Sequence, residues 1–78
     1  MSLLSMRHMG MGQEGMISSV KAGGEIGRRL RDMGLIKGTL VKILRRAPLF
    51  DPVAIRIKGF TLTLRNNEAD YIDVEVKE

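Results

Sequence analysis

The sequence lacks cysteine and tryptophan, and it has only two phenylalanines and one tyrosine. Without cysteine, neither a disulfide nor a thiolate metal site can stabilise the fold. Grooves for proline-rich peptides and platforms for single-stranded nucleic acid are built from several aromatic rings, so both kinds of site are disfavoured. No apolar run approaches the roughly 20 residues that span a bilayer, and no signal-peptide pattern opens the chain. We therefore expect a cytoplasmic protein.

Catalytic side chains are also scarce. The only histidine is His8, close to the N-terminus. A Ser/His/acid or Cys/His arrangement therefore has no histidine available in the region predicted to fold. The glycine-containing stretch at 34–39 fails the phosphate-loop pattern, because its lysine precedes the second glycine and a strand follows it. We expect a protein that is not an enzyme.

A chain of 78 residues fits one small domain with a thin core. Residues 1–12 show neither strand nor helix patterning, and we expect a flexible N-terminal leader there. Residues 13–78 form the predicted domain. Alternation of apolar and polar residues predicts strands at 15–21, 39–46, 53–58, 60–65 and 72–77. We expect a mainly β fold, with about five strands curled into a small barrel, whose full closure would remove exposed strand edges.

One short helix is predicted at 25–33, before the turn at Gly34. Ile26, Leu30 and Met33 recur at helical spacing, so we expect them to share the buried face. A polar connection at 66–70 has room for one helical turn.

Charge is unevenly distributed along a chain whose net charge is +4. Residues 28–65 hold seven arginines and three lysines against two aspartates, whereas residues 66–78 hold five acids against one lysine. A basic body suits an acidic protein surface, a phosphate backbone or an anionic membrane, and it also suits plain solubility. A basic nucleic-acid-binding barrel therefore stays open as an alternative function.

Two groups of residues are candidates for metal ligation. A soft-ligand cluster near the N-terminus would suit copper(I), and it comprises Met6, His8, Met9 and Met11. Hard oxygen ligands are available from Asp51, Glu68, Asp70 and Asp73, but their spacing matches no calcium or magnesium loop. We expect no certain cofactor, at most weakly bound ferrous iron or another transition metal, and the metal-ligating residues are unknown.

Three stretches of the sequence resemble the FeoA family, ferrous-iron transport protein A. They are 29–39 (RLRDMGLIKGT), 45–52 (RRAPLFDP) and 62–74 (LTLRNNEADYIDV), and the resemblance spans residues 13–77. It implies an SH3-like β-barrel and a small cytoplasmic accessory protein of ferrous-iron uptake, which acts on the large GTPase-containing membrane permease FeoB. The chain departs from the family pattern at Phe50, where glycine is usual, and at Lys37, where proline is frequent.

The predicted partner-binding residues are those that the patterning leaves exposed, namely Arg28, Arg29, Arg31, Leu49, Phe50 and Arg65. An exposed Leu49–Phe50 pair between two prolines is suited to anchoring a partner, or a second copy of the chain in a homo-oligomer. The expected partner is the cytosolic part of a FeoB-type permease. The alternative implied by the resemblance is a metal-responsive regulatory domain, like the C-terminal domain of iron- or manganese-dependent repressors.

Overall fold

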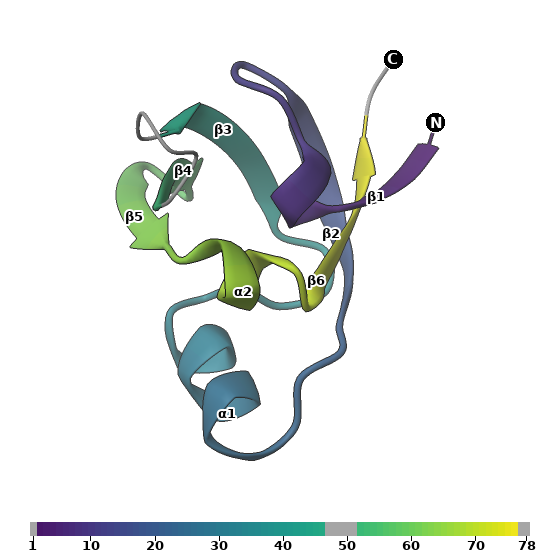
Figure 1. The fold of residues 1–78 in the computed structure, drawn as a ribbon, viewed down its shortest axis with the longest axis vertical. Helices are drawn as coiled ribbons and strands as arrows, with labels where there is room; N and C mark the ends of the chain where they lie inside the picture. Colours follow the sequence, from purple (N-terminus) through teal and green to yellow (C-terminus); the bar gives the residue numbers. More distant parts are fainter. Residues whose placement is uncertain (1, 47–51, 77–78) are drawn as a thin grey trace.

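Six antiparallel strands form a single sheet in the computed structural model, which describes residues 2–46 and 52–76 (Figure 1). In chain order the described elements are β1 (Ser2–Ser5), the 3-10 helix η1 (Met6–His8), β2 (Glu14–Val20), α1 (Gly24–Asp32), β3 (Leu40–Arg46), β4 (Val53–Ile57), β5 (Phe60–Leu64), α2 (Asn66–Ala69) and β6 (Ile72–Val76). The order across the sheet is β1-β6-β2-β3-β4-β5. The prediction of a mainly β fold is confirmed.

The core comes from the inward-facing positions of the strands. Alternate residues of β4 and β6 are buried, as their sequence pattern predicts, and Val41 and Ile43 of β3 join them. Phe60 differs, since it alternates with Leu62 and Leu64 along β5 but is 47% exposed. It directly follows the turn into β5, which is an edge strand with a neighbour on one side only.

The N-terminal segment is folded, so the prediction of a flexible leader at residues 1–12 is wrong for the residues that the structure describes. β1 pairs with β6 in the register Ser2↔Val76 to Ser5↔Asp73. Met6 and Met9 follow it into the core, with exposed fractions of 0% and 1%. The backbone edge of β6 and the burial of two flexible apolar side chains supply the stabilisation that the local pattern lacks.

Arg46 of β3 connects η1 and α2 through hydrogen bonds. Its guanidinium donates hydrogen bonds to the carbonyl oxygens of Met6, Arg7 and Met9 at 2.8–3.1 Å, and to Oδ1 of Asn66 at 3.0 Å. Burial lowers the pKa of this guanidinium from its ordinary value. One side chain thus joins β3 to both η1 and α2.

Helix α1 begins at Gly24 and ends where Gly34 adopts a φ of +95°, as the sequence predicts. Its buried face differs from the prediction, because Gly27 and Leu30 are buried while Ile26 is 43% exposed. A Cβ on Gly27 would lie 2.1 Å from the carbonyl oxygen of Ala22. The missing side chain therefore lets α1 lie against the segment that precedes it, which turns Ile26 outward.

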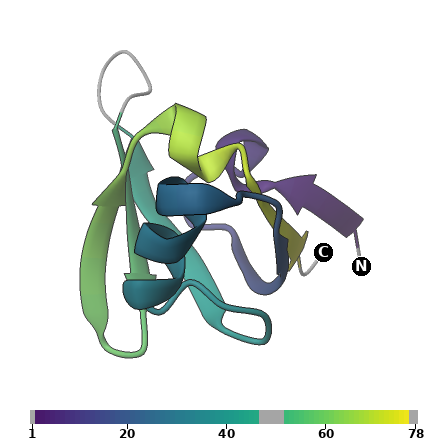
Figure 2. The same cartoon turned by 90° about the horizontal axis from the view of Figure 1, so that it is seen from below.

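The sheet is not closed within the described residues, since β1 and β5 remain as its two edges. The four-residue α2 leads from β5 to β6, and α1 lies below it in Figure 1 and in front of it in Figure 2. The single helical turn expected at 66–70 is this α2. None of the helices within residues 2–46 and 52–76 has the length and apolarity needed to cross a membrane.

Candidate functional site

The outer face of α1 carries three arginines. Because Gly27 and Leu30 face the core, Arg28, Arg29 and Arg31 are all exposed, as the sequence predicts. Within residues 2–46 and 52–76, neither Arg28 nor Arg31 forms an ion pair. Their guanidinium groups are therefore available to a partner, which they can bind through bidentate hydrogen bonds to carboxylates.

Glu68 connects this helix to α2. One of its carboxylate oxygens forms an ion pair with Arg29, and the other accepts a hydrogen bond from the backbone N–H of Arg65 at 3.1 Å. The Glu68 side chain is 9% exposed, whereas that of Arg29 is 63% exposed. Glu68 therefore holds the guanidinium end of Arg29 through its Nη2 atom, while most of the Arg29 side chain stays in solvent.

A shallow hollow of about 300 Å³ lies where α1 meets α2, lined by Ile26, Arg29, Arg65, Asn67 and Glu68. The structure thus brings together Arg29 and Arg65, two residues predicted from separate parts of the sequence. Glu68, which links them, was considered only as an oxygen ligand for a metal. Leu49 and Phe50, the other predicted contact residues, lie outside the described residues. We call the exposed Arg28, Arg29, Arg31 and Arg65 the arginine face.

The structure separates the four residues that were considered as soft metal ligands near the N-terminus. Met6 and Met9 are core residues, while Met11 is 70% exposed and His8 is also at the surface. The pairing of β1 with β6 accounts for this separation, because Met6 of η1 and Met9 at its end then lie in the core.

The candidate acids are engaged with basic side chains instead. Asp70 lies 3.8 Å from Arg7, and Asp73 lies 2.9 Å from Lys21. Asp51 lies outside the described residues. In the part of the chain that the structure describes, no three His, Cys, Asp or Glu side chains are grouped so as to hold a metal ion. The metal-ligating residues therefore remain unassigned.

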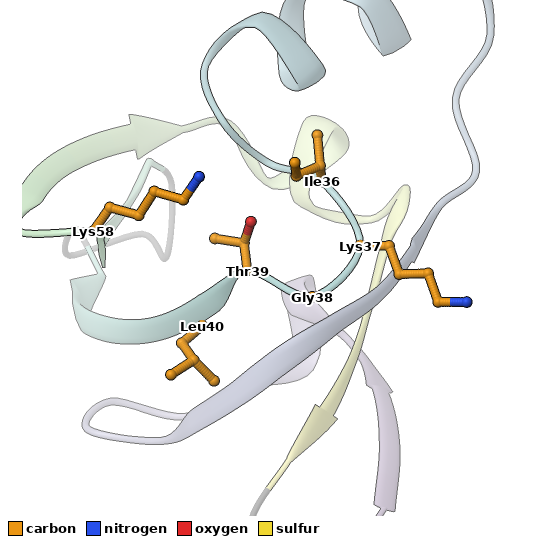
Figure 3. A pocket seen from close by; sticks show the side chains of 6 residues that line it. All are labelled: Ile36, Lys37, Gly38, Thr39, Leu40 and Lys58. Carbon is orange, nitrogen blue, oxygen red and sulfur yellow. The ribbon is translucent and has the colours of Figure 1, made fainter.

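A second candidate surface was missed by the sequence analysis. Met16, Ile36 and Leu40 are 46%, 44% and 59% exposed. Ile36 and Leu40 line a shallow hollow with Lys37 and Lys58 (Figure 3), and Met16 lines a neighbouring one that shares Lys37. The signal was present in the alternation of β3, because burial of Val41 and Ile43 directs Leu40 outward with Lys42. We call this surface the leucine–lysine groove.

The FeoA domain family matches residues 4–76, nearly the whole chain and including the segment predicted to be a leader. A curated relative is the Fe(2+) transport protein A/Fe(2+) transporter FeoB fusion protein of Porphyromonas gingivalis. It is 34% identical over 65 residues, which are 83% of this chain but only 8% of that protein. The chain thus corresponds to a small part of this relative.

Solved structures show the same fold. The FeoA protein of Chlorobium tepidum is 38% identical, with a TM-score of 0.86 over 94% of this chain and 70% of that chain. FeoA of Stenotrophomonas maltophilia, an SH3 domain protein complexed with zinc, is 25% identical, with a TM-score of 0.81 over 92% of this chain and 89% of that one. A manganese-dependent transcriptional repressor shares the fold alone, at 18% identity and a TM-score of 0.89 over 99% of this chain and 38% of its own. The predicted SH3-like architecture is confirmed.

Proposed function

Because the chain belongs to the FeoA domain family, whose members are linked to ferrous-iron transport, we propose that it is an accessory protein that binds the cytosolic part of a FeoB-type permease. The observation that carries the proposal is the relative in which transport protein A and transporter FeoB form one fusion protein. Joining two domains in one chain raises their effective mutual concentration, which is useful when the domains act on each other. The proposal includes a cytoplasmic location at the inner face of the membrane.

The arginine face is the contact surface that we propose for this interaction. Its residues are exposed, they come from α1 and from the start of α2, and Glu68 holds the two elements together. Arginine is enriched among the residues that dominate interface energetics, and a concentrated positive field speeds association with an acidic partner. Leu49 and Phe50 remain predicted contributors to the same contact.

A titration of the full chain with the soluble cytosolic part of the FeoB-type permease from the same organism tests this proposal. The test variant is Arg28→Gln/Arg31→Gln, which keeps the Arg29–Glu68 ion pair. We expect its Kd to rise about tenfold, or roughly 1.4 kcal/mol. The matched control, Arg7→Gln/Arg45→Gln, removes the same charge from exposed arginines elsewhere and should bind like the wild type. Absence of wild-type binding would contradict the function, and equal losses in both variants would contradict the contact surface.

Binding of a transition metal is the second candidate function, and the zinc complex of the S. maltophilia relative favours it. Isothermal calorimetry with zinc, ferrous iron and manganese on the full chain tests it. A chain lacking residues 1–12 is unsuitable, because it would lose β1 and two core methionines. We expect heat at near-stoichiometric metal, and the idea fails if the folded full chain gives none. The His8→Ala variant then reports whether that exposed imidazole is a ligand.

A further inference from the structure

Three neighbouring hollows with shared lining residues make up the leucine–lysine groove beside the start of β3. The central hollow, of about 390 Å³, is lined by Ile36, Lys37, Gly38, Thr39, Leu40 and Lys58. It shares Lys37 and Gly38 with a hollow of about 130 Å³ toward β2 and β6, and it shares Leu40 and Lys58 with one of about 230 Å³ toward β4. The groove therefore crosses the outer surface of several strands.

The floor of the groove is aliphatic. Met16 and Leu40 are register partners on β2 and β3, so their side chains lie next to each other on the outer surface of the sheet. Ile36 stands across Thr39 from Leu40 (Figure 3). Covering exposed apolar surface yields roughly 25 cal/mol per Å². An aliphatic side chain of a partner would gain this free energy here.

Cations outnumber acids in the lining of the three hollows, where Lys37, Lys42, Arg56 and Lys58 stand against Glu14 and Glu75. Lys42 and Arg56 are register partners, and like charges placed opposite each other destabilise a sheet. Glu14 lies 3.8 Å from Lys42. Within residues 2–46 and 52–76, Lys37, Arg56 and Lys58 form no ion pair. A carboxylate brought by a partner would relieve this repulsion.

Lys58 occupies a backbone position that is unusual for lysine. Its φ is +45°, the only positive value at a non-glycine among the described residues, and Gly59 follows with +87°. Both central positions of such a two-residue hairpin turn require positive φ, which asparagine and glycine tolerate best. In Figure 3 the Lys58 side chain extends over the hollow toward Thr39, whereas Lys37 points away from it. The strained turn thus holds an ammonium group over the groove.

We propose that the leucine–lysine groove docks an acidic segment of the permease, with an aliphatic side chain on Leu40 and Ile36 and carboxylates at Lys58 and Arg56. This inference rests on the proposed function and assigns it a second contact, separate from the arginine face. Charge complementarity selects an acidic occupant, because four cations line the three hollows against two acids, and of these cations only Lys42 has an ion pair in the described part of the chain. A concave aliphatic floor fits a protruding side chain better than it fits a flat lipid surface.

The experiment uses the same titration with two groove variants. Lys58→Asn removes the ammonium group and supplies a residue that tolerates positive φ, so its melting temperature should not fall. Leu40→Gln removes the aliphatic floor at an exposed position. We expect each variant to raise the Kd about tenfold, or roughly 1.4 kcal/mol. Lys21→Asn, which removes an exposed lysine outside the groove, is the matched control and should leave the Kd unchanged.

The outcomes separate this inference from the function on which it rests. If the wild type fails to bind the permease fragment, both are overturned. If the wild type binds and both groove variants bind as tightly, only the groove assignment is overturned. Vesicles of phosphatidylglycerol and sedimentation of the protein alone test the other occupants. Groove variants that lose only vesicle binding, or only self-association, would assign the groove to a membrane or to a second copy and overturn the proposal.

Discussion

Two of the exposed arginines of α1 and the half-buried Arg46 differ in what their guanidinium groups contact. Arg46 is half-buried, and its guanidinium donates hydrogen bonds to three backbone carbonyl oxygens and one side-chain amide oxygen. Arg28 and Arg31 are exposed on α1, with no ion pair in the described part of the chain. Sequence patterning predicted exposure on the helix but gave Arg46 no special role, because its acceptors lie 20–40 positions away.

Replacing Arg46 by lysine should destabilise the protein. A single ammonium group cannot reach all the acceptors that the planar guanidinium bridges. We expect Arg46→Lys to lower the free energy of unfolding by about 2 kcal/mol, measured by urea unfolding. Burial lowers the pKa of Arg46, but arginine stays protonated at ordinary pH, so the loss should be constant from about pH 5 to pH 9. Arg45→Lys, at the exposed neighbouring position, is the control, and an equal loss there would contradict the assigned role.

Gly27→Ala should also destabilise the protein, although alanine favours helices. Its Cβ would meet the carbonyl oxygen of Ala22, a backbone atom that moves only if α1 moves. We expect a net loss of about 1–2 kcal/mol, since the overpacking cost exceeds the ~1 kcal/mol that alanine gains over glycine in a helix. Gly10→Ala, where a Cβ meets open space, should change stability by less than about 0.5 kcal/mol. A Gly27→Ala protein as stable as the wild type would refute this account.

For α1, the end of the helix could be predicted from the sequence, but the residues of its buried face could not. Gly34 was predicted as the helix end because positive φ is a local property of the chain. Gly27 was not predicted to be buried, because the buried face of a helix is recognised from its apolar side chains and glycine has none. The inward position of Gly27 is decided by its contact with Ala22, which only the folded chain defines.

At the scale of elements, β1 and η1 depend on contacts that their own sequence does not reveal. In β1, Leu3 is 58% exposed while Leu4 packs against the core. Both residues are leucine, so the sequence shows no alternation of apolar and polar residues there. Its strand forms because β6 offers a backbone edge from Ile72 to Val76. The register Leu4↔Val74 then brings the following methionines to the core.

Core methionines in η1 and at its end should therefore matter to stability as much as strand residues do. We expect Met6→Ala and Met9→Ala each to lower the free energy of unfolding by about 2–4 kcal/mol, because each deletes a fully buried side chain. Differential scanning calorimetry measures the corresponding fall in Tm. Met11→Ala, at a residue that is 70% exposed, should leave Tm within about 2 °C of the wild type. Equal Tm values for all three variants would restore the view of a flexible leader.

For the whole molecule, strand alternation predicted the fold class and most of the core. Closure was not predictable, because it depends on whether β5 pairs with β1, two strands more than 50 residues apart. Instead the chain continues from β5 through α2 into β6. The arginine face was predictable in part, since exposed arginines have a local signature, whereas the leucine–lysine groove depends on the register between β2 and β3.

The basic body of the chain, residues 28–65, should make binding to an acidic partner depend on ionic strength. Salt screens attraction between exposed charges over a Debye length of about 10 Å at 0.1 M. We expect the Kd for the permease fragment to rise severalfold between about 0.05 M and 0.5 M salt, mainly through a slower association rate. Stopped-flow or surface plasmon resonance measures that rate. The Arg28→Gln/Arg31→Gln variant should show a shallower dependence, and salt-independent binding by the wild type would contradict electrostatic steering.

The pairing of β1 with β6 places the two ends of the described chain next to each other. Ser2 and Val76 are register partners, so both ends of the described chain leave from one side, while α1 lies toward the opposite end (Figure 1). A tether at either end is therefore attached to the same side of the molecule. The tether can be a surface-coupling tag or a longer polypeptide. Such a tether leaves α1 at the end opposite to its anchor, and it can be exchanged from one end to the other without reversing the orientation of the domain.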